Sequence, residues 1–266
     1  MEQNRKRDRR KRWLGWFMLL PGLLLLLSVL LLLRLSIVTD YFYHAVVKDP
    51  VRKIPFGENI VSPADGTVLY VKRITNGVLP EVVKRDVPIS LSDLIKDAPT
   101  KPMKEGFLIG IYMNTESVHI TRVPVDGTYL KQIIFNGPHM SMMEMDKSVI
   151  LTAMIPGLVT VKKLIGLNPF DIEKNGDYIL KSARETSVIS DNRGSSVYVI
   201  RIADYWVGKI LTWVEEGQAV EKGAKMGTIT WGSQVDICFE NTPGLKLHDV
   251  KVGDYVYAGE TVLASY

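Results

Sequence analysis

The chain is poor in cysteine and histidine. Cys238 is the one cysteine among 266 residues, and the four histidines are His44, His119, His139 and His248. A single cysteine excludes a disulfide framework and a cysteine-based zinc site within one chain. Cys238 lies between Ile237 and Phe239 in an alternating apolar run, so we expect it to be a small core residue.

Several catalytic motifs are also absent. The chain contains no His-Glu-x-x-His, no Walker-type phosphate loop and no Gly-x-Ser-x-Gly. These absences remove support for a zinc protease, a phosphate-loop NTPase and an α/β-hydrolase. We therefore expect no metal site.

Excess positive charge is missing from most of the chain. The net charge is +4, and seven of the 33 Lys and Arg residues fall within residues 1–12. The remainder is close to neutral, whereas a nucleic-acid-binding domain shows a basic face. We expect a basic N-terminal tail over residues 1–12 and no nucleic-acid partner.

One long apolar run follows this tail. Trp13 to Leu33 is 21 residues without a charge, which is long enough for a helix to span a bilayer. We expect one membrane segment over residues 13–38, a membrane location for the protein, and a linker over residues 39–55. Pro21-Gly22 could kink a spanning helix or turn a re-entrant segment, so the topology stays open.

The rest of the chain, residues 56–266, has the pattern of short strands. Alternating apolar runs bounded by turn residues occur at 67–71, 107–112, 197–202 and 261–264. Helix signals are few, and the clearest is Ser90 to Ala98, with Ser90 as the cap and Asp93 three residues later. We predict a mostly β (α+β) body with few helices.

Two weak internal repeats refine this prediction. Pro63-Ala64-Asp65-Gly66 returns as Pro124-Val125-Asp126-Gly127, and each is a turn that leads into a strand. Residues 216–223 are echoed by residues 252–260, with two glycines six residues apart around a valine. Together the repeats favour a barrel-sandwich body of the lipoyl and biotinyl type, preceded by the N-terminal membrane helix.

A Gly-Ser pair, Gly232-Ser233, interrupts an apolar pattern that indicates strand on both sides. Such a pair usually marks a bulge or a close backbone approach. The chemical alternative is that the Ser233 hydroxyl attacks the Gly232 carbonyl and turns the amide into an ester. Glycine would allow that attack because it has no side chain to obstruct it.

These motifs, in this order, resemble those of the phosphatidylserine decarboxylase proenzymes, in the short form found in archaea and some bacteria. The matching stretches are Lys48 to Pro55, Val61 to Gly66, His119-x-x-Arg122-x-Pro124, Trp231 to Asp236, and Val252 to Thr261. The resemblance implies that the chain cuts itself at Gly232-Ser233, through an ester and a dehydroalanine, to leave a pyruvoyl group at position 233. Residues 1–232 and 233–266 would then form a heterodimer, with further dimerisation possible.

The same resemblance implies the reaction. The pyruvoyl carbonyl would form a Schiff base with the amine of phosphatidylserine and draw off the electrons left when CO2 departs, which yields phosphatidylethanolamine. No external cofactor would be needed. The expected partners are phosphatidylserine and the lipid bilayer.

Individual roles also follow from the resemblance. Ser233 would be first the nucleophile and then the prosthetic group, Asp65 would assist self-processing, and His119 would give a proton to the carbanion. Longer relatives have a second histidine where this chain has Arg122. Arg122 could bind the substrate carboxylate or phosphate. His119 could then serve both steps, or Ser233 could be activated in another way.

Two other hypotheses stay open. A membrane-anchored adaptor with lipoyl-like hairpins would explain the repeats, but it would need a long heptad stretch and has no use for Gly-Ser. A degenerate relative that no longer cuts itself would explain why Gln234 replaces the family's usual arginine. The region from residue 135 to 184, longer than in short relatives, has no assigned role.

Overall fold

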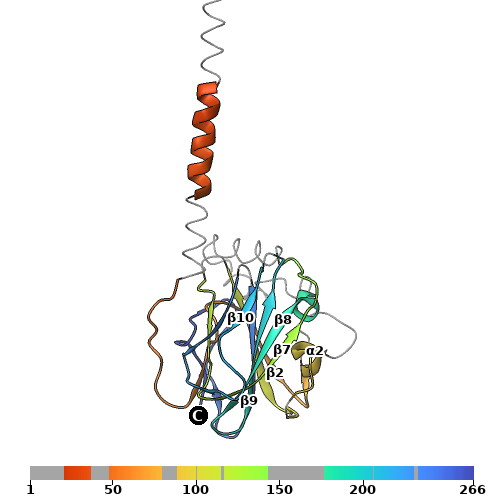
Figure 1. Ribbon diagram of the computed structural model, residues 1–266. Coiled ribbons are helices and arrows are strands. Elements are labelled where there is room, and N and C mark those ends of the chain that lie inside the picture. The colour runs from red at the N-terminus through yellow and green to blue at the C-terminus, as the bar shows by residue number, and fades with distance from the viewer. Residues whose placement is uncertain are drawn as a thin grey trace, which may run out of the picture. The chain divides into compact units, whose positions relative to one another are not determined.

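The computed structural model describes residues 21–36, 48–79, 89–99, 101–114, 117–142, 177–205, 207–230 and 233–266. The chain divides into two compact units, Met1–His44 and Ala45–Tyr266. Figure 1 shows the helix of the first unit, over residues 21–36, and the β-rich second unit.

The helix of the first unit corrects the prediction of a membrane segment over residues 13–38. Within the described ranges, no helix is long and apolar enough to cross a membrane. The membrane location derived from Trp13 to Leu33 is therefore overturned, and residues 13–20 of that run lie outside the described residues.

The second unit is mostly β, as predicted, and its main element is a curled eight-stranded antiparallel sheet (Figure 1). The strand order is β11 (Ala219–Val220), β7 (Gly127–Phe135), β8 (Arg184–Asp191), β9 (Ser196–Ala203), β13 (Ser233–Glu240), β5 (Gly106–Met113), β2 (Gly66–Ile74) and β15 (Tyr255–Val256). The likeness to the barrel-sandwich folds stays a prediction.

Smaller elements cover the two faces of this sheet. Two three-stranded sheets have the orders β1 (Asn59–Val61), β16 (Val262–Ser265), β14 (Lys246–Leu247) and β10 (Ile210–Thr212), β12 (Lys225–Ile229), β6 (Ile120–Arg122). Among the described residues, the other elements of this unit are the paired strands β3 (Val78–Leu79) and β4 (Ile89–Ser90) and the helices α2 (Leu91–Ile95) and α6 (Tyr178–Lys181).

The central strand β13 is buried on both faces, because its side chains alternate between two hydrophobic clusters. Val235, Ile237 and Phe239 belong to the cluster that also contains residues of the small sheets. Cys238 belongs to the other cluster, with residues of α2 and α6, and is fully buried as predicted. Ser233 therefore enters the sheet on the face of the small sheets.

The internal repeats correspond to equivalent structures. The turn at Asp65 leads into β2, and the turn at Asp126 leads into β7. Val68 exchanges backbone hydrogen bonds with residues 253 and 254, and Tyr129 does the same with residues 217 and 218. The edge strands β15 and β11 therefore pair with β2 and β7 in the same way.

The predicted short helix is present but ends early. Ser90 caps α2 through the predicted capping box, because its side chain accepts from the Asp93 backbone and the Asp93 side chain accepts from the Ser90 backbone. The helix ends at Ile95 since Lys96 adopts a left-handed conformation, with φ of 64°. Residues 96–98 of the predicted helix are therefore not helical.

Candidate active site

Ser233 is the first residue of β13 and is fully buried. In the sheet it lies opposite Met113 of β5 on one side and Ala203 of β9 on the other. Its hydroxyl donates to the Met113 thioether, with an Oγ–Sδ distance of 3.4 Å. A thioether is a weak acceptor, so it holds the hydroxyl proton loosely. Gly232, the other half of the predicted cleavage site, lies outside the described residues.

His119 is attached by its backbone to the strand that precedes this site. Its carbonyl accepts from the Ile229 amide at 3.2 Å and from the Thr228 hydroxyl at 3.0 Å. Both residues belong to β12, and Ile229 is four positions before Ser233. The small sheet therefore fixes His119 beside the segment that enters β13.

The His119 imidazole is fully buried, and neither ring nitrogen makes a hydrogen bond within the described part of the chain. Burial lowers the pKa of His119 to about 4, although the Ser117 backbone partly opposes the shift. The imidazole is therefore neutral near pH 7 and can accept a proton from a neighbouring group.

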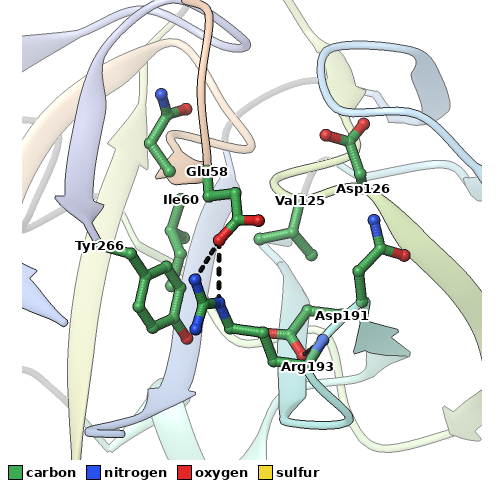
Figure 2. Close-up of a pocket in the computed structure, with 9 residues that line it drawn as sticks. Glu58, Ile60, Val125, Asp126, Asp191, Arg193 and Tyr266 are labelled. Atoms are coloured by element: carbon green, nitrogen blue, oxygen red, sulfur yellow. Dashed lines mark hydrogen bonds and ion pairs between the residues drawn. The ribbon is translucent and has the colours of Figure 1, made fainter. Parts of the chain in front are cut away.

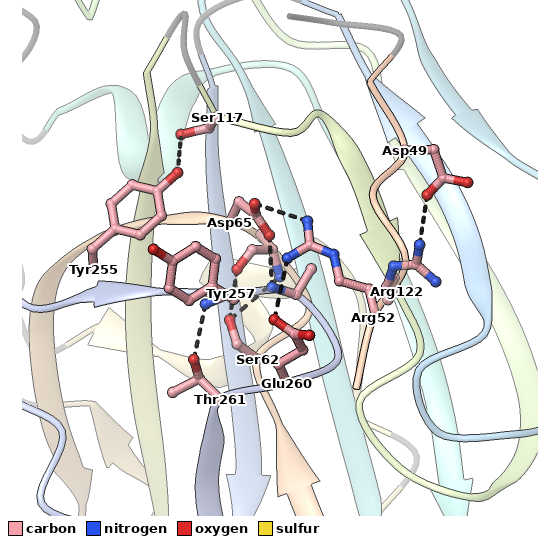
Figure 3. Close-up of polar contacts among 12 residues, drawn as sticks. Asp49, Arg52, Ser62, Asp65, Ser117, Arg122, Tyr255, Tyr257, Glu260 and Thr261 are labelled. Carbon is pink, nitrogen blue, oxygen red and sulfur yellow. Dashed lines mark hydrogen bonds and ion pairs between the residues drawn. The ribbon is translucent and has the colours of Figure 1, made fainter. Parts of the chain in front are cut away.

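Asp65 is held from two sides (Figure 3). Its Oδ2 accepts from Arg52 Nη2 at 2.9 Å, and its Oδ1 accepts from the Ala258 amide at 2.7 Å. The repeat partner Asp126 accepts from the Lys222 amide at 2.8 Å, but it is exposed. The backbone contact is therefore common to both repeats, and the pairing with a buried arginine distinguishes Asp65.

Arg122 is engaged by neighbouring groups as well (Figure 3). Its Nη2 donates to Asp49 Oδ1 at 2.6 Å, and its Nη1 donates to the Gly223 carbonyl at 2.8 Å. Asp49 also pairs with Lys225. Partial burial disfavours the Asp49 anion, but the two cations lower the pKa of Asp49 overall. Whether Arg122 binds substrate stays a prediction.

Two cavities border the neighbours of Ser233. The larger one, of about 480 Å³, is lined by Asp65, by Asn114, which follows Met113, and by Val118, which precedes His119. The smaller one, of about 180 Å³, is lined by Ala203, the partner of Ser233 on β9. The larger cavity therefore borders the end of β5, and the smaller one borders the end of β9.

A third hollow lies at the other end of the sheet, away from Ser233. Figure 2 shows Glu58 and Arg193 joined as an ion pair there, beside Asp126, Asp191 and Tyr266. Asp191 ends β8, and the hairpin that follows leads into the start of β9, whereas Ser233 faces the end of β9. This hollow of about 50 Å³ is therefore separate from the candidate site.

The structure brings the predicted residues to one end of the sheet. No hydrogen bond joins Ser233, His119 and Asp65 to one another in the described ranges. Sequence reasoning missed Arg52, which precedes the β body by several residues and has no periodic pattern to mark it. Its one available signal was its place in the family-like stretch from Lys48 to Pro55.

Comparisons with known proteins identify the family of this chain. The family model described as phosphatidylserine decarboxylase matches residues 39–264. A putative archaetidylserine decarboxylase proenzyme of Methanocaldococcus jannaschii is 31% identical over 86% of this chain and 90% of its own length. A phosphatidylserine decarboxylase proenzyme of Chlorobium limicola is 26% identical over 91% of this chain and 84% of its own length. The chain therefore belongs to the phosphatidylserine decarboxylase family.

Proposed function

We propose that this chain cuts its own backbone between Gly232 and Ser233, carries a pyruvoyl group at position 233, and converts phosphatidylserine to phosphatidylethanolamine and CO2. Membership of the family makes the chain a self-processing decarboxylase. The observation that supports the site most directly is the position of Ser233, which is buried as the first residue of a central strand.

Self-processing rearranges one peptide bond. Ser233 Oγ attacks the Gly232 carbonyl carbon, the C–N bond between the two residues breaks as the ester forms, and the freed amine takes up the hydroxyl proton. Loss of the Ser233 α proton then expels the Gly232 carboxylate and leaves a dehydroalanine. Water hydrolyses this group and releases ammonia, which leaves the pyruvoyl group at position 233.

His119 is the proposed base of this sequence. Its neutral imidazole, held beside β12, can take the Ser233 proton and return it to the amine. Arg122 cannot act in this way because a guanidinium stays protonated, and it is already bound to Asp49. We therefore assign both self-processing and proton delivery during decarboxylation to His119.

Asp65 acts in this proposal as a fixed anion. The Arg52 guanidinium, whose side chain is 4% exposed, forms a charge-assisted hydrogen bond with this carboxylate. The larger cavity is lined by Asp65 and by Val118, the residue before His119. Asp65 thus supports the local charge balance during processing.

A pyruvoyl group fits the surroundings of position 233. The position is fully buried between Met113 and Ala203, and the smaller cavity reaches Ala203. When bound there, the group supplies a carbonyl that acts as an electron sink for loss of CO2. The residues around it exclude water and hold the proton that the carbanion takes up.

Denaturing mass spectrometry of the purified protein tests this function. We expect two chains, residues 1–232 and 233–266, with the smaller one carrying a carbonyl that reacts with hydroxylamine. Ser233→Ala should run as one intact chain without decarboxylase activity, and Ser195→Ala, which alters a turn serine remote from the site, should process normally. An intact wild-type chain would instead favour the degenerate relative.

Archaetidylserine is a second candidate substrate. Two relatives at 31% and 30% identity, from Methanocaldococcus jannaschii and Methanothermobacter thermautotrophicus, are named putative archaetidylserine decarboxylase proenzymes. Both lipids present a phosphoserine head group, so the same site chemistry serves either one. Initial rates with each lipid, measured as CO2 release, distinguish the two substrates.

A further inference from the structure

A buried ion pair shares a sheet face with Ser233. Glu185 of β8 lies directly opposite Arg201 of β9, and Ala203, two residues after Arg201, lies directly opposite Ser233. Opposed residues of an antiparallel sheet point to the same face, and so do residues two apart on one strand. Glu185, Arg201 and Ser233 therefore face the same side.

Only one of the two oxygens of the Glu185 carboxylate accepts hydrogen bonds from described residues. Glu185 is 3% exposed, and its Oε1 accepts from Arg201 Nη2 and from the Thr212 hydroxyl. Its Oε2 accepts no hydrogen bond from the residues that the structure describes. Oε2 is not among the buried atoms that lack a partner, so it is the carboxylate oxygen that remains open to the adjacent space.

The free oxygen belongs to a residue that lines a cavity. Glu185 and Ala203 both line the cavity of about 180 Å³, together with the exposed side chains of His139 and Lys209. The cavity thus combines a buried anion, near the partner of Ser233, with cationic or neutral nitrogen donors that are open to solvent.

We propose that this cavity binds the phosphoserine head group of the substrate, and that Glu185 Oε2 binds its ammonium group. An ammonium group carries three donors and is the chemical complement of a buried carboxylate with one free oxygen. Ala203 lines the same cavity and lies opposite Ser233, so a head group bound there lies on the side of the sheet that carries the reactive residue. Lys209 and His139 face the phosphate. This inference rests on the proposed function and adds the head-group site.

The test uses the full-length, self-processed enzyme and a short-chain, water-soluble phosphatidylserine. For Glu185→Gln, which keeps an oxygen for Arg201 and Thr212 but removes the charge, we expect normal self-cleavage and a KM raised about tenfold or more. Short-chain phosphatidylglycerol has a phosphate but no amine, so it should inhibit Glu185→Gln as strongly as it inhibits the wild-type enzyme. Glu185→Asp should recover part of the lost affinity.

Lys209→Ala supplies a variant that does not threaten the core, because Lys209 is exposed. It should weaken binding of both lipids by a similar factor. Arg193→Ala, at the remote hollow, is the matched control and should change neither. Unchanged KM values in the Glu185 and Lys209 variants of a cleaved, active enzyme would overturn the head-group site alone. An uncleaved, inactive wild-type chain would overturn the proposed function itself.

If Glu185→Gln fails to fold, Lys209→Ala still tests whether the cavity binds the phosphate of the head group. Binding of the ammonium group is then tested on the wild-type enzyme, by comparing short-chain phosphatidylethanolamine and phosphatidylglycerol as competitive inhibitors. Tighter binding of the amine-bearing lipid supports an anionic subsite, and equal binding contradicts it.

Discussion

At the residue scale, the two repeat aspartates show how one motif serves two purposes. Asp65 and Asp126 each accept a hydrogen bond from an equivalent backbone amide, of Ala258 and Lys222. Asp65 alone of the two pairs with a buried arginine, Arg52. The turn sequence therefore accounts for the backbone contact, and the pairing with Arg52 accounts for the different environment of Asp65.

This difference predicts different effects of matched substitutions. Asp65→Asn keeps an acceptor for the Ala258 amide but leaves the nearly buried Arg52 without its closest anion, so self-cleavage should slow at least tenfold. Asp126→Asn, at the exposed equivalent position, should process at the wild-type rate. A mass-spectrometric time course of precursor loss measures both. Equal cleavage rates in the two variants would show that Asp65 has no special role in self-cleavage.

His119 predicts a pH dependence of stability. Its folded pKa of about 4 lies below the usual value of 6.5, so the unfolded chain binds more protons between these two pH values. The contribution of His119 is complete above pH 6.5 and is lost as the pH falls toward 4, by about 3 kcal/mol in total. Asp236 opposes it, because burial raises its folded pKa to about 6.

The two contributions can be separated in uncleaved protein. In the Ser233→Ala background, urea unfolding of chains with and without His119→Gln should differ more at pH 7 than at pH 4.5, with the histidine chain gaining stability as the pH rises. A difference that stays constant with pH would show that His119 is not buried as a neutral group.

At the element scale, the centre of the sheet is held by a polar network on the face opposite Ser233. Asp236 of β13 accepts from the Tyr70 hydroxyl at 2.6 Å, and Gln234 bonds both of them, at 2.6 Å to Asp236 and 2.8 Å to Tyr70. Tyr178 of α6 donates to Gln234 at 2.6 Å. Gln234 thus links β13 to β2 and α6.

A glycine on β5 makes room for this network. A Cβ atom at Gly110 would overlap the Tyr70 ring, whereas one at Gly208 would meet nothing closer than 3.7 Å. Gly110→Ala should therefore move Tyr70 away from Asp236 and lower the free energy of unfolding by about 1–3 kcal/mol. Gly208→Ala should be nearly neutral. Urea denaturation of both variants measures the contrast, and equal stabilities would argue against the close packing of Tyr70.

At the scale of the whole molecule, the two chains that cleavage would produce contribute strands to the same sheets. The segment 233–266 contributes β13, which pairs with β5 and β9, and β16, which pairs with β1. Cutting before Ser233 therefore removes no strand from the sheets. The two chains should stay together because their shared core is buried on both faces of β13.

Because the two fragments share these sheets, we predict that they co-purify. Under native conditions the 34-residue fragment 233–266 should elute with residues 1–232 in size-exclusion chromatography, and it should separate only in denaturant. Recovery of the small fragment alone from native buffer would contradict the proposed heterodimer. A matched run of intact Ser233→Ala protein gives the reference elution volume.

The amino-acid sequence by itself determined the strand-rich body, the two Pro-x-Asp-Gly turns, the cap of α2 and the family-like Gly232-Ser233 pair. Each of these depends on neighbours along the chain, so alternation and turn residues are enough to predict it. Only the tertiary structure decided that Arg52 holds Asp65, that Asp49 holds Arg122, and that Glu185 shares a face and a cavity with the partner of Ser233. Those pairings depend on strand order and register, which are properties of the folded core and leave no local pattern in the sequence.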